Sequence, residues 1–352
     1  MLLVTYRCNL RCTYCYEPKQ ASFGMDADMA KRYIQRQVER LGDEYAAFEV
    51  QFMGGEPLLA FPLIMEVAEW LWSQHFDKTL KVLFAPTNGT LLTDGMKQWL
   101  TANRHRFCLG LSFDGDAIMQ DANRSQSHDR VDIAYFAATW PWQSVKMTVS
   151  PQTVCRLSEG VRYLSAHGFA CIVADLAMGS GVAWSRQSLA VFKQQLDTLA
   201  DYYVEHPQEP RVSMLGIDLA GLYNGGNSEK CCSCGEQLVC IDCDGSEYAC
   251  HLFSPVACDR QKARAGRDIA FADHSRFVSA ACRRCRLVRL CNRCAGMNYI
   301  CNGDVAEPLA FHCAAFKVMF FANCRMQYLL AQKSGDARTV AMIDNIVKSV
   351  SM

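Results

Sequence analysis

Cysteine is the residue that most constrains how this chain can fold, because its 352 residues include 20 of them. Sixteen lie in two blocks, three between residues 8 and 15 and thirteen between residues 231 and 313. Disulfide scaffolds are mostly small secreted domains, whereas this chain is long, half hydrophobic and shows no export signal. We therefore expect metal or iron–sulfur ligands and a reducing, cytoplasmic compartment. The other four cysteines are expected to be buried as small hydrophobic residues: Cys108, Cys155, Cys171 and Cys324.

The charge balance argues against two classes of partner. Lys plus Arg and Asp plus Glu are equal at 36 each, so the chain has no overall field that would attract nucleic acid or an anionic membrane. The sequence also lacks a run of about 18 apolar residues, so a membrane-spanning helix is not expected.

Residues 1–205 alternate between two hydrophobic patterns. Apolar runs typical of strands occur at residues 2–6, 48–53, 80–85, 107–113, 145–150 and 171–177. Helical spacing follows each run, at residues 26–41, 61–75, 93–100, 131–138, 157–167 and 187–203, with Asp26 and Thr93 as N-caps. Strands that alternate with helices indicate βαβ units and a parallel sheet. Six units are too few for an eight-fold barrel, so we predict an α/β fold, either an open sheet or a partial (β/α)6 barrel.

A change of character at residues 206–210 marks a domain boundary, because this segment contains two prolines. Residues 206–325 are rich in loops and cysteine and are predicted to form a second, iron–sulfur domain. Helical spacing returns at residues 314–330 and again at 337–350. We expect residues 326–352 to form a helical tail.

Polar and glycine-rich motifs follow four of the predicted strands. In chain order they are Cys8-Asn-Leu-Arg-Cys12-Thr-Tyr-Cys15, Gly54-Gly55-Glu56-Pro57, Thr87-Asn88-Gly89 and Ser112-Phe113-Asp114-Gly115. Each dipeptide such as Gly-Gly or Asp-Gly is by itself also typical of a plain turn. In parallel barrels, however, the chemistry gathers at the C-terminal ends of the strands. We therefore expect the four motifs to form one site.

The first motif places three thiols within eight residues, which can hold three corners of a [4Fe–4S] cluster and leave one iron open to an external ligand. A zinc site would need a further ligand, and no histidine lies near in the sequence. This loop, with an aromatic residue before its last cysteine, resembles that of the radical S-adenosylmethionine (SAM) superfamily. The resemblance implies that Cys8, Cys12 and Cys15 hold the cluster and that SAM chelates the open iron through its amino and carboxylate groups.

The resemblance extends to the later strand-end motifs and to Asp121-Ala-Asn-Arg124, in order and spacing. It implies that Glu56 balances the ammonium of SAM, while Ser112 and Arg124 bind its carboxylate, Arg124 through a bidentate fork. Asp114 would hold ribose hydroxyls or cap a turn. The full expected cofactor-binding set is Tyr14, Gly54, Gly55, Glu56, Asn88, Ser112, Asp114 and Arg124.

The second cysteine block resembles the SPASM domain, a C-terminal extension of radical SAM enzymes that modify peptides and proteins. The resemblance implies two auxiliary [4Fe–4S] clusters, and hence three clusters in all, with ligands that cross over along the chain. One auxiliary cluster would be held by Cys234, Cys240, Cys250 and Cys294. The other would be held by Cys282, Cys285, Cys291 and Cys313.

The choice of ligands in this block stays open at the sequence level. The spacing between Cys291 and Cys294 is one residue shorter than is usual for the domain. Cys232 can replace Cys234, and Cys243 can replace Cys240. The cysteines without an assignment are Cys231, Cys232, Cys243, Cys258 and Cys301. The main rival interpretation is a zinc site with four thiolates, Cys282, Cys285, Cys291 and Cys294.

Basic residues surround the second ligand set: Arg260, Lys262, Arg264, Arg267, Arg283, Arg284, Arg286, Arg289 and Arg293. The plainer interpretation is a solvated basic face that offsets the negative charge of the clusters. The alternative is a dock for an acidic electron donor of the flavodoxin type or for an acidic peptide. Nucleic acid is not expected here, because no aromatic residues that could stack on bases are interleaved with the arginines.

The resemblance implies an oxidoreductase that acts on a peptide or protein. Reductive cleavage of SAM would generate a 5′-deoxyadenosyl radical that takes hydrogen from a substrate side chain. The leading expectation is maturation of a ribosomally synthesised peptide by a thioether or carbon–carbon cross-link. The enzymatic alternative is an anaerobic sulfatase maturase, which makes formylglycine from Cys or Ser. A non-enzymatic iron–sulfur or zinc protein is the third hypothesis.

Two features bear on the choice between the enzymes. The segment at residues 294–299 departs from the sulfatase-maturase pattern and favours peptide maturation. Against it, the cluster motif begins at residue 8, so a leader peptide would have to bind the barrel or the SPASM surface. The expected partners are a peptide substrate with a leader and an electron donor of the flavodoxin or ferredoxin type.

Overall fold

A curved sheet of parallel strands forms the centre of the computed structural model, which describes residues 1–17, 24–179, 181–222 and 232–351. Its six strands are β1 (Leu2–Thr5), β3 (Phe52–Gly54), β5 (Leu83–Thr87), β6 (Phe107–Leu111), β7 (Val145–Val149) and β8 (Ile172–Leu176). Parallel pairing joins β1 to β3, β5 to β6 and β7 to β8. Parallel bridges from Gln51 to Phe84 and from Ser112 to Lys146 connect these pairs. The predicted partial barrel is confirmed, with the strands in chain order.

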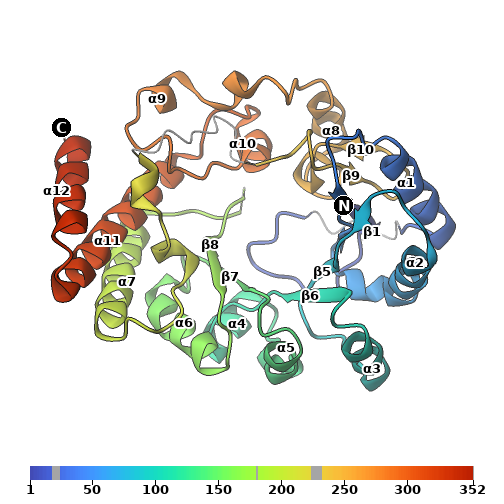
Figure 1. Cartoon of the computed structure of the whole chain (residues 1–352), viewed down its shortest axis with the longest axis horizontal. Helices are drawn as coiled ribbons and strands as arrows, with labels where there is room; N and C mark the ends of the chain where they lie inside the picture. The colour runs from blue at the N-terminus through green and yellow to red at the C-terminus, as the bar shows by residue number, and fades with distance from the viewer. Residues whose placement is uncertain (18–23, 180, 223–231, 352) are drawn as a thin grey trace.

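Helices cover the outer face of the strands (Figure 1). They are α1 (Ala27–Glu39), α2 (Phe61–Ser73), α3 (Asp94–Ala102), α4 (Ala117–Asn123), α5 (Ile133–Thr139), α6 (Leu157–Ala166) and α7 (Arg186–Glu205). Asp26 and Thr93 are N-caps as predicted, because their side chains accept from the backbone N–H groups of Met29 and Met96. Two short strands, β2 (Ala47–Phe48) and β4 (Thr79–Leu80), pair with each other beside the barrel.

Helix α4 was not predicted, because two of its three buried residues, Gln120 and Asn123, are polar and so it shows no apolar period. Its start is nevertheless encoded locally. The side chain of Asp116 accepts from the N–H of Met119 and caps the helix. The helix places Gln120, Asn123 and Arg124 beside the end of β6, so this short element matters for the site described below.

The cysteine-rich region begins after α7 and returns to the barrel at two places. Strand β9 (Cys240–Ile241) pairs in parallel with β1, and β10 (Glu247–Tyr248) pairs antiparallel with β9. Three short helices follow, α8 (Arg260–Gly266), α9 (Ala280–Arg283) and α10 (Ala295–Asn302). The long helix α11 (Ala310–Ser334) then packs on α7, and α12 (Ala337–Ser351) packs on α11. Figure 1 shows this region in orange, spanning from β1 at one edge of the sheet to α11 beside the other edge.

The two C-terminal helices confirm the predicted return of helical spacing, but helix α11 runs through residues 325 and 326, where the boundary of a tail was expected. Met326 on this helix is fully buried in the same core as the barrel helices. The C-terminal helices therefore pack as part of the main core. Among the residues that the structure describes, none of the helices is both long enough and apolar enough to cross a membrane.

Two of the four isolated cysteines differ from the expectation that they are buried. Cys108 and Cys324 are buried, whereas Cys155 and Cys171 are exposed. Cys155 lies in a one-turn 3-10 helix, and Cys171 directly precedes β8. A small apolar residue at the end of an element need not face the core.

Candidate functional site

The three-cysteine loop emerges from the C-terminal end of β1 and is tied to the end of α4. The N–H of Thr13 donates to the carbonyl of Asn123 over 2.9 Å, and the N–H of Arg11 donates to Ser125 Oγ over 2.7 Å. Leu10 anchors the loop in the core with 1% of its surface exposed. This leaves the thiols accessible: Cys8 and Cys12 are half-buried, and Cys15 is exposed. The chain thus presents three thiols that form no disulfide on one anchored loop, which is the donor set that a [4Fe–4S] cluster with an open iron requires.

Glycine at positions 54 and 55 lets β3 approach the start of this loop. A Cβ atom on Gly54 would lie 2.1 Å from the carbonyl oxygen of Thr5, and one on Gly55 would lie 2.6 Å from that of Arg7. Gly54 also has a φ of +150°, which favours glycine. Backbone hydrogen bonds join the two segments where they come close, since the N–H of Gly55 donates to the carbonyl of Thr5 and the N–H of Glu56 to that of Arg7. The glycines therefore set the position of the segment that leads into Cys8.

Replacing Gly54 with alanine is expected to destabilise the protein by at least about 1–3 kcal/mol, because the side chain meets backbone and the φ is unfavourable. It should also weaken SAM binding, because the cysteine loop must shift. Gly95→Ala is a matched control, since Gly95 lies in α3 with open space around it, and alanine there should be neutral or stabilising. Thermal unfolding and equilibrium dialysis of SAM with the anaerobically reconstituted proteins measure both effects. Equal behaviour of the two variants would contradict this account.

A second connection joins the cysteine loop to the end of β5. Asn88 Nδ2 donates to Asn9 Oδ1 over 2.9 Å, and Asn9 Nδ2 donates to Thr90 Oγ1 over 2.7 Å. Asn9 sits between Cys8 and Leu10 and was not singled out from the sequence. Asn88 thus holds the cysteine loop through the side chain of Asn9. This contact is consistent with the expectation that Asn88 lies at the site.

The carboxylate of Glu56 is engaged by the protein itself. It is 1% exposed and accepts from Thr87 Oγ1, from the N–H of Asn88 and from the N–H of Leu58, at 2.8 to 3.1 Å. Burial raises the pKa of Glu56, although these three hydrogen bonds oppose the shift. This geometry does not support the expectation that Glu56 balances a ligand's ammonium. Glu56 instead fixes the ends of β3 and β5 against each other.

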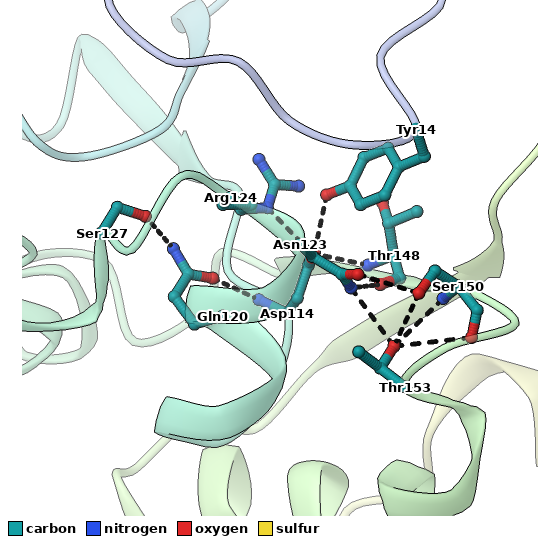
Figure 2. A network of polar contacts seen from close by, with 9 residues as sticks. All are labelled: Tyr14, Asp114, Gln120, Asn123, Arg124, Ser127, Thr148, Ser150 and Thr153. Atoms are coloured by element: carbon teal, nitrogen blue, oxygen red, sulfur yellow. Dashed lines mark hydrogen bonds and ion pairs between the residues drawn. The ribbon is translucent and has the colours of Figure 1, made fainter. Parts of the chain in front are cut away.

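Asp114 is the centre of the polar network in Figure 2. Its carboxylate has no exposed surface and accepts from the Tyr14 hydroxyl over 2.6 Å and from the N–H of Thr148 over 2.9 Å. Asn123 Nδ2 donates to it over 3.1 Å, and Arg124 Nε lies 2.9 Å from Oδ1. Both carboxylate oxygens are therefore occupied, which leaves Asp114 a positioning role in place of the expected contact with ribose. Through Tyr14 it holds the cysteine loop to β6 and α4.

The network continues beyond the predicted residues. Gln120 accepts from the N–H of Asp114 and donates to Ser127, while Asn123 accepts from Ser150 Oγ over 2.8 Å (Figure 2). Asn123 lies inside the Asp121–Arg124 motif, so the sequence indicated that it is near the site. The motif did not indicate that Asn123 contacts Asp114 and Ser150. Ser150 was predicted only as the last residue of a strand, and nothing in the sequence indicates its contact with α4.

Arg124 and Ser112 are placed to bind an anionic group. The Arg124 guanidinium lies over the Tyr14 ring, 5.4 Å from its centroid. Burial is the largest single effect and lowers the pKa of Arg124, but Asp114, Tyr14 and Cys12 together outweigh it, so this pKa is raised. Within the described residues, neither the terminal nitrogens of Arg124 nor the Ser112 hydroxyl has a hydrogen-bond partner. These free donors beside the cysteine loop fit the carboxylate of SAM, and we expect that group to bind there.

The four cysteines predicted for the second auxiliary cluster surround one cavity. Cys282, Cys285, Cys291 and Cys313 all line a cavity of about 230 Å³ at the N-terminal end of α11. Cys294, which the rival zinc site would need, is not among its lining residues. The arrangement therefore separates Cys294 from the other three members of that zinc set and brings Cys313 in its place.

Cys294 lies instead with the first auxiliary set. Cys234, Cys240 and Cys250 are buried in one cluster of side chains, and Cys294 packs against it. Burial raises the pKa of Cys250 to about 12. The Sγ of Cys234 is 3.4 Å from that of Cys232. The crossed pattern stays a prediction, and Cys232 remains an alternative to Cys234 as a ligand.

The remaining cysteines are accounted for in part. Cys243 donates its S–H to the carbonyl of Leu3 over 2.9 Å, which argues against its replacing Cys240 as a ligand. Cys258 donates to the carbonyl of Ser254, and Cys301 is half-buried on α10. Cys231 lies outside the described residues. In the part of the chain that the structure describes, no three His, Cys, Asp or Glu side chains are arranged to hold a single metal ion.

A contact between Tyr16 and His251 joins the two domains between the predicted cluster sites. Tyr16 follows Cys15, His251 follows Cys250, and the Tyr16 hydroxyl lies 3.0 Å from His251 Nε2. Burial lowers the pKa of His251 to about 4, so the ring is neutral. Its Nδ1 is buried without a partner among the described residues. No sequence pattern indicated this pair.

Most of the arginines near the second ligand set bind backbone. Arg283 donates to the carbonyl of Ser275, Arg286 to Ser349 and Arg289 to Leu222. Arg293 is 6% exposed and donates to the carbonyls of Val288 and Cys291. Through these contacts the arginines hold the loops of the cysteine-rich region, a role that neither interpretation from the sequence had named. Arg260, Arg264 and Arg267 form a separate group that lines a cavity of about 190 Å³ beside Asp242.

Comparison with known proteins agrees with this site. Residues 2–134 match the family model of the Radical SAM superfamily. The chain is 24% identical to a cysteine-type anaerobic sulfatase-maturating enzyme of Clostridium perfringens, with 89% of this chain and 92% of the relative covered. It is 25% identical to a serine-type anaerobic sulfatase-maturating enzyme of Klebsiella pneumoniae, with 86% and 85% covered.

Two solved structures share the fold of the whole chain. One is native anSMEcpe with bound AdoMet and Kp18Cys peptide, at a TM-score of 0.70, 19% identity and coverage of 98% of this chain and 99% of that one. The other is Streptococcus suis SuiB bound to precursor peptide SuiA, at a TM-score of 0.59, 15% identity and coverage of 89% and 74%.

Proposed function

The chain contains a radical SAM domain, and we propose that it is an enzyme that oxidises a residue of a peptide or protein substrate. The observation that carries the proposal is the anchored loop of Cys8, Cys12 and Cys15, held by the Asp114 network beside the unpaired donors of Arg124 and Ser112. The relatives that share most of the chain's length are named for acting on sulfatases, and the two similar structures hold peptides. A protein or peptide is therefore the substrate class that we assign.

The residues of this chain bind, aim and exclude water, and the cofactors carry the chemistry. When bound, SAM and the cluster supply a 5′-deoxyadenosyl radical that can take a hydrogen atom from the substrate. Cys8, Cys12 and Cys15 would hold the cluster, and Arg124 and Ser112 would hold the carboxylate of SAM. Tyr14 keeps its proton because burial raises its pKa well above the usual range, so it goes on donating to Asp114 and fixes the loop.

For the product, we now favour formylglycine over the cross-link that the sequence led us to expect. Two kinds of sulfatase maturase are 24–25% identical to this chain and are covered over at least 85% of their own length, whereas SuiB is 15% identical and is covered over 74% of its length. Oxidation of cysteine to formylglycine removes two hydrogens and exchanges sulfur for oxygen, while oxidation of serine removes two hydrogens only. The cross-link stays the second candidate, because the chain also shares its fold with SuiB, whose structure holds a precursor peptide.

Mass spectrometry of a peptide after anaerobic reaction with SAM and dithionite tests this choice. With Kp18Cys, the formylglycine proposal predicts loss of two hydrogens with exchange of sulfur for oxygen, and reaction of the new aldehyde with a hydrazide. With SuiA, the cross-link proposal predicts loss of two hydrogens and no aldehyde. Product from SuiA alone would overturn formylglycine as the favoured product.

We also propose that the chain holds three [4Fe–4S] clusters, so reconstitution should give about twelve iron atoms per chain. Cys285→Ala is expected to lower this to about eight, because Cys285 belongs only to the set around the cavity of Cys282, Cys291 and Cys313. The exposed Cys171 supplies the control variant, and Cys171→Ala should retain full iron. Iron and zinc are counted by plasma emission after anaerobic gel filtration. About four iron atoms with bound zinc in the wild type would contradict the auxiliary clusters.

Electrons for such chemistry come from outside the chain. We propose a flavodoxin or ferredoxin as the physiological donor, as the resemblance implies. The exposed arginines of α8 offer a positive surface for an acidic donor of this type.

A further inference from the structure

An exposed ion pair lies on the inner face of the barrel, next to the site described above. It is formed by Lys146 of β7 and Asp175 of β8, whose side chains are 41% and 59% exposed. Both residues lie within parallel strands of the barrel, β7 and the last strand β8. Charges are normally kept out of buried parallel strands, so this pair needs an explanation.

Strand alternation shows which face carries the pair. Val145, Met147 and Val149 of β7 and Ile172, Ala174 and Leu176 of β8 are buried in the main core, which also contains the apolar faces of α6 and α7. Successive side chains point to opposite faces of a strand. Lys146 and Asp175 therefore point away from the helices and into the barrel.

The pair adjoins the proposed SAM site on two sides. Lys146 forms a parallel bridge with Ser112, and Thr148, whose N–H donates to Asp114, is the register partner of Asp175. Ser112, Lys146 and Asp175 thus form a polar row, at the end of β6 and on β7 and β8, beside the cofactor residues.

We propose that Lys146 and Asp175 determine substrate binding by receiving the backbone of one substrate residue in an extended conformation, the ammonium donating to its C=O and the carboxylate accepting from its N–H. This inference rests on the proposed function and names the part of the site that recognises the substrate class. The N–H and C=O of one residue in an extended chain point to the same side, which matches the two neighbouring charges. Solvent-exposed ion pairs contribute little to stability, so this pair can open for a ligand at small cost. Recognition of backbone leaves the neighbouring side chains free to vary.

The test is retention of peptides by the reconstituted holoenzyme with SAM present. The probe is a library of random-sequence peptides with a central cysteine or serine, quantified by mass spectrometry after anaerobic filtration. Lys146→Met and Asp175→Asn are each expected to retain about tenfold less than wild type, as expected for loss of one charge-assisted hydrogen bond. Lys146→Arg should restore much of the retention, because it keeps a cation that donates.

The control is an ion pair of the same chemistry outside the barrel. Lys193 and Asp197 pair over 2.6 Å on α7, so Lys193→Met and Asp197→Asn should retain peptides as wild type does. Undiminished retention by Lys146→Met and Asp175→Asn would overturn the inference and leave the proposed function standing. No retention by wild type would overturn both. Circular dichroism confirms that each variant is folded before it is scored.

Discussion

Cys12→Ala is expected to reduce formation of 5′-deoxyadenosine from SAM to the level of a reaction without enzyme. Loss of a residue that only supports a metal ligand already costs about 10–100-fold in affinity or activity, so loss of a ligand should cost more. In the described part of this loop, the other cysteines are Cys8 and Cys15. Both are already needed as ligands, so neither can replace Cys12. The auxiliary clusters should remain, so the variant should keep about eight iron atoms. The measurement is chromatography of deoxyadenosine formed with dithionite under anaerobic conditions.

Cys155→Ala serves as the matched control, because Cys155 is exposed and belongs to neither cysteine block. It should cleave SAM as wild type does. Wild-type deoxyadenosine formation by Cys12→Ala would contradict the assignment of the first cluster. Loss of all iron in that variant would instead mean that the three sites do not assemble independently.

Asp114→Asn is expected to destabilise the protein by about 3–5 kcal/mol, because it leaves the charge of Arg124 without its buried partner. Asp114 has no exposed surface, and the side chain of Arg124 is 9% exposed, so water compensates little. The exchange also places an amide where the Tyr14 hydroxyl and the Thr148 N–H both donate. Urea unfolding of the reconstituted protein, followed by tryptophan fluorescence, measures the change in the free energy of unfolding.

A double variant separates the charge from the loss of hydrogen bonds. Adding Arg124→Gln to Asp114→Asn should recover part of the stability, because it removes the uncompensated charge. Asp129→Asn is the control, since the side chain of Asp129 is 99% exposed and its exchange should change the free energy of unfolding by less than about 0.5 kcal/mol. A loss below about 1 kcal/mol for Asp114→Asn would show that the pair is not desolvated.

Most of the fold was predictable because its strands and helices show local patterns of apolar residues in the sequence. The six parallel strands and the helices that cover them appear as alternating apolar runs and helical spacing, and Asp26 and Thr93 cap helices as their positions indicated. Helix α4 is an exception, because two of its three buried residues, Gln120 and Asn123, are polar and hide its helical period. Helical spacing at residues 314–330 correctly indicated α11, which extends a few residues further at both ends.

The site was predictable as a set of motifs but not as a set of contacts. The motifs correctly placed Tyr14, Asp114 and Arg124 in one network. The roles of Glu56 and Asp114 differ from expectation, because carboxylates with so little exposure are engaged by protein donors before a ligand can reach them. Whether a carboxylate binds protein donors or a ligand depends on how deeply it is buried, and a sequence motif does not show this.

Long-range pairs were beyond reach of the sequence for a different reason. Tyr16 and His251 are 235 residues apart and meet only because the cysteine-rich region returns to the start of the barrel. Lys146 and Asp175 looked like ordinary strand residues, and their position inside the barrel follows from the register of β7 and β8. A single sequence shows neither that the cysteine-rich region returns to β1 nor in which register β7 pairs with β8.

The most direct test of the account is the origin of the hydrogen atom in deoxyadenosine. The reconstituted wild-type protein is given SAM, dithionite and a perdeuterated library of random-sequence peptides with a central cysteine or serine, and the deoxyadenosine is analysed by mass spectrometry. An enzyme that takes hydrogen from a peptide must form deoxyadenosine that carries deuterium, and Cys12→Ala must form none. Deoxyadenosine without deuterium, or no deoxyadenosine at all, would contradict the claim that this chain is a radical SAM enzyme acting on peptides.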